Sequence, residues 1–152
     1  MSIEVQSVTK SYETQLALNE ISFSASKGEI IGFLGPNGAG KSTMMKILTG
    51  FILPTKGAVF VSGINVLKNP IEAKAHIGYL PEQNPLYEDM YVKEYLQFQA
   101  SIFKVPKEAI ETVVNTVGLK PEVHKKIGQL SKGYQQRVGI AAAIIHNPDV
   151  LV

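Results

Sequence analysis

The first half of the chain alternates short apolar stretches with turns, a pattern that predicts strands with a few short helices between them. Two stretches show the apolar-polar alternation of half-buried strands, Ile3 with Val5, and Leu18 with Ile21 and Phe23. Residues 30–34 are continuously apolar, which predicts a strand covered on both faces. Residues 41–49 predict a short helix closed by Gly50, and residues 57–61 predict a further strand. These elements together predict a mixed sheet.

The second half changes to helical spacing. Two sets of residues recur with the period of a helix, Tyr95, Leu96, Gln99 and Phe103, and then Ile110, Val113, Val114 and Val117. Pro106 marks a helix start and Gly118 a helix end. Ser131 is placed to cap a third helix, which Asn147-Pro148 would end before a new strand at residues 149–152. The middle of the chain is therefore predicted to be a helical unit.

Composition and charge narrow the class of protein. The 152 residues are 45% hydrophobic and 18% charged, as in a globular domain with a buried core. The net charge is only +2, without a long basic run, so nucleic acid is not an expected partner. With no cysteine, a disulfide framework and a thiolate metal site are excluded. The N-terminus does not look like a signal peptide and no apolar stretch approaches the ~18 residues of a membrane span, so we expect a soluble, cytoplasmic domain.

Residues 35–42 carry the clearest chemistry. They match the phosphate-loop pattern G-x-x-x-x-G-K-[ST] in full, between a predicted strand and a predicted helix. In such a loop glycines let consecutive N–H groups converge on a polyanion, the lysine reaches the β- and γ-phosphates, and the hydroxyl binds Mg²⁺. The predicted nucleotide-binding residues are Gly35, Pro36, Asn37, Gly38, Ala39, Gly40, Lys41, Ser42 and Thr43, with Thr43 on the α-phosphate side. The alternative is a glycine-rich turn with a solvated lysine.

A second segment separates the classes that share this loop. Residues 130–137, about ninety residues after Lys41, resemble the L-S-G-G-Q signature of ATP-binding cassette proteins, and further motifs of that family occur in order along the chain. The sequence therefore resembles the nucleotide-binding domain of an ABC transporter, of the bacterial multidrug or gliding-motility exporter type. The resemblance implies an α/β P-loop NTPase core with mixed or antiparallel N-terminal strands, from residues 1–86 and 148–152. It also implies a helical subdomain over residues 87–147.

The resemblance assigns roles to particular residues. Tyr12 takes the position of the aromatic residue that stacks on adenine; the alternative is a tyrosine that only covers a sheet edge. The signature, which acts in trans on the γ-phosphate held by another subunit, maps to Ser131, Lys132, Gly133, Tyr134 and Gln135. It departs from the family pattern because Lys132 and Tyr134 replace the usual glycine and glutamine. A capped helix without a ligand is the alternative.

The Q-loop position of the family, which senses Mg²⁺ and the attacking water, aligns with Glu82, followed by Gln83. Either side chain could serve, since carboxylate and amide oxygens both ligate Mg²⁺; the alternative for each is a surface turn residue. The three histidines, His76, His124 and His146, are expected to be surface or core residues.

The resemblance covers the N-terminal two thirds of a cassette and ends in the Walker B strand. The Walker B Asp and Glu, the D-loop and the switch histidine would follow Val152. We therefore expect the 152 residues to bind ATP and Mg²⁺ without turnover, because phosphoryl transfer depends on positioning and charge neutralisation.

In the full-length protein the resemblance implies an ATPase that drives a transmembrane permease docked around residues 82–90. It also implies a dimer with a second nucleotide-binding domain on ATP, at the inner face of the cell membrane. The alternatives are a soluble cassette clamp or regulator without a membrane partner, and a module that only binds nucleotide. A GTPase is disfavoured because no N-K-x-D segment occurs.

Overall fold

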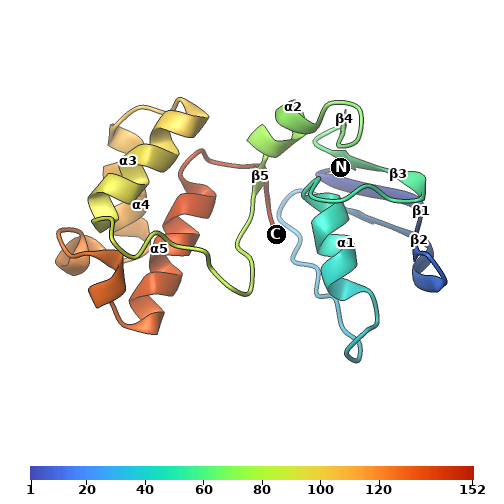
Figure 1. Ribbon diagram of the computed structural model, residues 1–152. Coiled ribbons are helices and arrows are strands. Elements are labelled where there is room, and N and C mark those ends of the chain that lie inside the picture. The colour runs from blue at the N-terminus through green and yellow to red at the C-terminus, as the bar shows by residue number, and fades with distance from the viewer. The chain divides into compact units, whose positions relative to one another are not determined.

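The structure is a computed structural model that describes residues 1–152, and the chain divides into two compact units (Figure 1). The first unit contains residues 1–77 and Val152, and the second contains residues 78–151. Residues 78–86, which the sequence analysis placed with the core, group with the helices of the second unit. No helix has the length and apolar character that crossing a membrane would require.

The first unit is built on a four-stranded antiparallel sheet. Its strands are β1 (Ile3–Tyr12), β2 (Gln15–Ala25), β3 (Lys56–Val61) and β4 (Ile64–Asn65), in the order β2-β1-β3-β4. The alternation noted in the sequence places Val5 and Val8 in the core, at 2% and 0% exposed. Helix α1 (Lys41–Leu48) contacts β2 and β3 and buries Met44 and Ile47. Helix α2 (Pro70–Ala75) lies against β4.

The second unit has a separate core made by three helices, α3 (Val92–Phe103), α4 (Glu108–Thr116) and α5 (Lys132–Ile144), which contact one another pairwise. Two 3₁₀ turns, η1 (Lys120–Glu122) and η2 (Ile127–Gln129), connect α4 to α5. Leu96, Leu119, Ile127 and Val138 are fully buried among these elements. The helical unit predicted from spacing, with a cap at Ser131, is confirmed.

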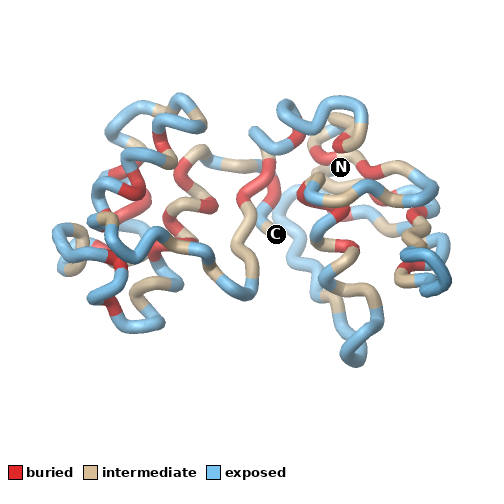
Figure 2. The backbone as a smooth tube through the Cα atoms, in the orientation of Figure 1, coloured by how far each residue is buried: buried red, intermediate tan, exposed pale blue.

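The apolar run at residues 30–34 forms no strand and is not covered on both faces. The prediction of a buried strand here is therefore wrong. Ile30 is 100% exposed and Leu34 is 96% exposed, and Figure 2 shows the segment before α1 mainly in pale blue. Phe33 alone packs, edge-on against Phe23 at 5.1 Å between ring centroids. A strand needs neighbours that accept its backbone hydrogen bonds, and no strand among residues 1–152 pairs with this run.

A short two-stranded sheet joins β5 (Ile77–Gly78) and β6 (Val150–Leu151). The apolar stretch at residues 77–80 thus forms strand only over its first two residues, and residues 149–152 form strand only over Val150 and Leu151. Gly78 fits tightly here, because a Cβ atom would meet the carbonyl oxygen of Ala143 and stand 2.9 Å from Cγ of Pro148. The β5–β6 pair therefore lies next to the C-terminal end of α5.

Candidate nucleotide site

The phosphate loop of the first unit leads directly into α1. Residues 35–39 are exposed, and α1 begins after Gly40 without any side-chain cap. The N–H groups at a helix start have no intrahelical partner, and the helix dipole adds a partial positive charge there. A helix start that leaves these donors uncapped and exposed is suited to bind an anion.

Lys41 is held by the loop itself. Its Nζ donates to the carbonyl oxygens of Gly35, at 2.6 Å, and Pro36, at 2.7 Å. Both acceptors are exposed to solvent, so the ammonium group can exchange these neutral oxygens for phosphate oxygens, whose negative charge makes the bonds stronger. Ser42 is exposed and Thr43 half-buried on the same first turn, which leaves the Ser42 hydroxyl free to bind a hard cation.

Gly40 requires the absence of a side chain. Its φ is +82°, and a Cβ atom would overlap the carbonyl oxygen of Ala17 and stand 2.7 Å from Cδ2 of Leu18. The end of the phosphate loop is therefore packed against strand β2 close to the β1–β2 hairpin. This contact was not foreseen from the sequence, because it joins residues more than twenty positions apart.

Tyr12 lies at that hairpin. It ends β1 and pairs with Gln15, which lies two residues before Ala17 in β2. The Tyr12 side chain is 46% exposed. The Nζ atom of Lys10 lies 4.9 Å from the centroid of its ring. The ring is therefore partly open to solvent at the hairpin, and its stacking on adenine stays a prediction.

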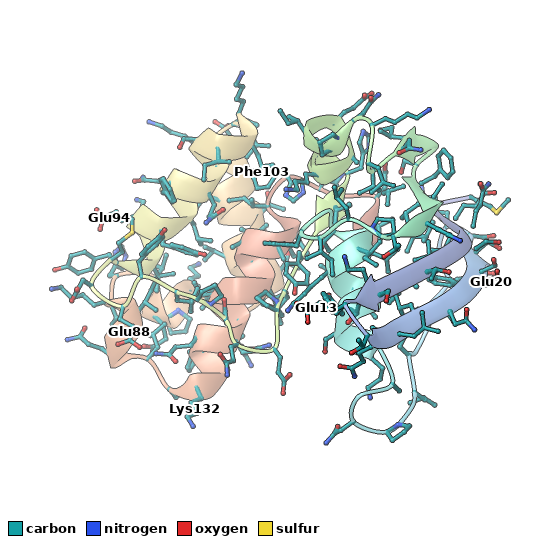
Figure 3. The ribbon with its side chains drawn as sticks, turned by 45° about the vertical axis from the view of Figure 1, so that its right-hand side comes forward. Glu13, Glu20, Glu88, Glu94, Phe103 and Lys132 are labelled. Atoms are coloured by element: carbon teal, nitrogen blue, oxygen red, sulfur yellow. The ribbon has the colours of Figure 1, made fainter.

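The signature segment begins α5 in the second unit. Ser131 is the N-cap, and its Oγ accepts from the backbone N–H of Tyr134 at 3.4 Å. Lys132 and Gly133 are exposed, and the Lys132 side chain extends outward from the start of the helix (Figure 3). A Cβ atom at Gly133 would meet nothing closer than 4.0 Å, so the space in front of this turn is open.

The N-terminal half of α5 is held by hydrogen bonds to the segments that precede it in sequence. The Nε2 atom of Gln135 donates to the carbonyl oxygen of Ile127 at 3.1 Å, which ties the signature helix to η2. Arg137 donates from Nη1 to the carbonyl oxygen of Val117 at 3.1 Å, and its guanidinium carbon lies 5.3 Å from the centroid of the Tyr134 ring. The signature helix is therefore held by the loops that surround it as well as by its core face.

Glu82 and Gln83 are exposed and lie outside any helix or strand, in the second unit. The phosphate loop is in the first unit, so the structure places these two groups of predicted site residues in separate units. Asn84, the next residue, contacts α5 and was not singled out from the sequence. No local signal marks it, since its partner Gln135 lies 51 residues further along the chain.

Comparison with known proteins identifies the class to which this fold and these loops belong. The family model described as "ABC transporter" matches residues 18–152. The chain therefore belongs to the ABC transporter family, as its ATP-binding domain.

Among curated relatives, the bacitracin transport ATP-binding protein BcrA of Bacillus licheniformis is 38% identical over 151 residues, which are 99% of this chain and 49% of that protein. The ABC transporter ATP-binding protein YhcH of Bacillus subtilis is 37% identical over 151 residues, 99% of this chain and 50% of that protein. The chain thus spans about half the length of these relatives.

Solved structures agree with the fold. An ATP-binding subunit of an ABC transporter superposes with a TM-score of 0.89 at 27% identity, over 99% of this chain and 65% of that one. The dimeric structure of MJ0796, described as a bacterial ABC transporter cassette, gives a TM-score of 0.85 at 28% identity, over 98% of this chain and 72% of that one. The predicted α/β fold with an antiparallel N-terminal sheet and a helical subdomain is confirmed.

Proposed function

We propose that this chain binds Mg²⁺-ATP at residues 35–43, and that the full-length protein hydrolyses ATP to drive a transmembrane partner. The observation that carries the proposal is the uncapped, exposed start of α1 behind a complete phosphate loop, with Lys41 Nζ already at the loop. Phosphoryl transfer needs little from the protein beyond such positioning and charge.

Each residue of the loop has a distinct part in binding. The backbone N–H groups of the loop, to which Pro36 contributes none, donate to phosphate oxygens, Lys41 neutralises the β- and γ-phosphates, and Thr43 contacts the α-phosphate side. The Ser42 hydroxyl is a hard oxygen donor of the kind that Mg²⁺ accepts, and its exposure leaves room for the waters that this cation keeps. Tyr12 stacks on the adenine ring, a contact that tolerates other bases because each has a π-face.

The signature completes the site in trans. Ser131 and Gly133 present a small hydroxyl and open backbone at the start of α5, where a γ-phosphate bound to a second copy can meet them. Lys132 adds a positive charge beside that position. The relative MJ0796, solved as a dimer and also in a dimeric post-hydrolysis state with ADP and Pi, supports a dimeric arrangement for this chain.

Hydrolysis needs groups that orient the attacking water and hold Mg²⁺. We assign this role to Glu82 and Gln83, which are exposed on a segment without regular structure. We expect residues 1–152 by themselves to bind ATP without steady-state turnover. The catalytic step then takes place in the dimer of the full-length protein.

The membrane partner docks on the second unit at residues 82–90 and the adjoining face of α3. Three aromatic side chains there are exposed, Tyr87 at 57%, Tyr91 at 49% and Phe98 at 43%, and the rings of Tyr87 and Phe98 meet edge-on with centroids 6.2 Å apart. Exposed aromatic side chains that contact each other, as Tyr87 and Phe98 do, are typical of a protein interface. A solved relative, cbiO1 of Clostridium perfringens, is described as part of a complex, cbiONQ. Such a partner would hold this domain at the inner face of the membrane.

A mixing experiment tests the composite site. In the full-length protein, Lys41→Ala removes phosphate binding, whereas Ser131→Arg leaves the phosphate loop intact and blocks the signature with a bulky cation. Each variant alone should lose ATPase activity. A mixture should recover part of it, because a heterodimer contains one site with an intact phosphate loop and an intact signature. Heterodimers that form and show no activity would contradict the placement of Ser131 opposite a partner's phosphate.

A further inference from the structure

Asn84 links two segments of the second unit that are far apart in sequence. It follows Glu82 and Gln83 directly, and its Nδ2 donates to the backbone carbonyl of Gln135 at 3.1 Å. That carbonyl belongs to the first turns of α5, the helix that Ser131 caps. A carbonyl oxygen has two lone pairs, so it can accept from Asn84 without giving up its place in the helix.

Gly139 provides the space for this contact. It is buried on α5, one turn after Gln135, and a Cβ atom there would overlap the Asn84 amide. The same Cβ would stand 2.7 Å from Cδ1 of Leu80, which precedes Glu82 and Gln83 in the sequence as Asn84 follows them. Glycine in a helix interior costs about 1 kcal/mol relative to alanine, so Gly139 weakens α5 at the position where the segment at residues 80–84 needs room.

The contact reaches the signature through a rigid path. Gln135 carries the Asn84 bond on its backbone, and its own side chain is fixed to the carbonyl oxygen of Ile127 at 3.1 Å. Ser131 lies one helical turn earlier, bound to the N–H of Tyr134. Adjacent turns of a helix move together because successive hydrogen bonds join them. Asn84 is therefore connected, through Gln135, to the helical turn that carries the Ser131 hydroxyl.

We infer that Asn84 is a positioning residue that, through the Gln135 carbonyl and the notch at Gly139, sets the orientation of the signature relative to the segment at Glu82 and Gln83. This inference rests on the proposed function, because it takes those two segments to act on the same nucleotide. Asn84 itself touches no substrate in this role. It makes closure of the dimer depend on where residues 82 and 83 lie.

Two substitutions of Asn84 separate the hydrogen bond from the filling of the notch. Asn84→Asp keeps the shape and replaces the donor with an oxygen that faces the Gln135 carbonyl; Asn84→Ala removes both. In the full-length protein the dissociation constant of the ATP-dependent dimer, measured by light scattering, should rise roughly 3- to 10-fold for Ala, as for one lost hydrogen bond, and at least as much for Asp. The affinity of the monomer for ATP should stay within about twofold for both, since the phosphate loop is unchanged.

Gly139→Ala tests the notch from the other side. Alanine favours the helix, so the thermal midpoint of unfolding should not fall through α5 itself, yet the methyl group displaces the Asn84 amide. The dimer should weaken by a factor similar to that for Asn84→Ala. The double variant should lose no more dimer affinity than the single variant with the larger loss, because both changes break the same contact. An additive loss would overturn the inference.

Asn115→Asp is the matched control, because Asn115 is an exposed residue on α4 that receives the same change of charge in the same unit. It should leave the dimer unchanged. Wild-type dimer affinity in Asn84→Asp, or weaker ATP binding by the monomers of the Asn84 variants, would overturn the inference.

A measurement without nucleotide separates the inference from the proposed function. Hydrogen exchange at amides 132–137 should be faster in Asn84→Asp than in wild type, with amides of α4 unaffected. Unchanged exchange would overturn the inference even if ATP binds. Faster exchange in a protein that fails to bind ATP would leave the Asn84 contact standing and refute only the proposed function.

Discussion

The two helix starts that carry the predicted phosphate chemistry are built in opposite ways. Helix α1 begins at Gly40 with no side-chain cap, after a loop in which Lys41 bonds to the carbonyl oxygens of residues 35 and 36. Helix α5 begins at Ser131, whose hydroxyl already satisfies the N–H of Tyr134. The first start has N–H donors without a side-chain acceptor, whereas one donor of the second start is already bound to its N-cap.

The segments that precede the two helix starts also differ in burial. The run that precedes the phosphate loop is exposed at both Ile30 and Leu34, while the segment that precedes α5 contains the fully buried Ile127 and the buried Leu130. Binding at α1 can therefore replace internal contacts with ligand contacts, and binding at α5 adds a ligand to a turn that is already formed. In the proposed function, the first unit would bind the nucleotide and the signature would join it afterwards.

The largest expected effect tests the contrast in burial. Leu119→Ala should destabilise the second unit by about 2 to 5 kcal/mol, because Leu119 is 0% exposed and truncation leaves a cavity in the three-helix core. Leu34→Ala, in the 152-residue chain, should change stability by less than about 0.5 kcal/mol, because the side chain is 96% exposed. Denaturant unfolding followed by circular dichroism measures both. A cost for Leu34→Ala equal to that for Leu119→Ala would show that Leu34 is covered in solution.

How far the sequence predicts each region follows from the range of the signals. The cap at Ser131 and the periodic helices depend on residues within a turn or two, and they were predicted correctly. Residues 30–34 were predicted wrongly as a buried strand, because burial of a strand on both faces depends on partners that local periodicity does not identify.

The site divides in the same manner. The phosphate-loop pattern is local, so its residues and the helix after it could be placed from the sequence. The packing of Gly40 on Ala17 and Leu18, and of Asn84 on α5, joins distant segments and carries no spacing that could be recognised beforehand. The roles of Glu82 and Gln83 stay predictions, since they lie in a different unit from the phosphate loop.

A smaller effect tests the first unit alone. Tyr12→Ala should weaken ATP and ADP equally, by about 1 to 3 kcal/mol if the ring stacks on the base. Pyrophosphate has no base, so its affinity should hardly change. Calorimetric titration of the three ligands measures this selectivity, and Tyr12→Phe, which keeps the ring, is the matched control. Equal weakening of pyrophosphate would mean that Tyr12 supports the phosphate loop through the hairpin next to Gly40.

The smallest effect tests whether the Ser131 cap stabilises the start of α5 in the absence of a ligand. Ser131→Ala removes the acceptor of the Tyr134 N–H and should lower the stability of the second unit by about 1 kcal/mol in the absence of nucleotide, the usual cost of a lost N-cap. Ser131→Asp keeps an acceptor and should cost much less, while it places a negative charge where a partner's γ-phosphate would lie. The two variants should therefore rank oppositely in two assays: Asp above Ala in thermal stability, and Asp below Ala in ATP-dependent dimerisation, because like charges repel. The same ranking in both assays would mean that the signature contributes through its own folding alone, and the contrast with the open start of α1 would then lose its functional meaning.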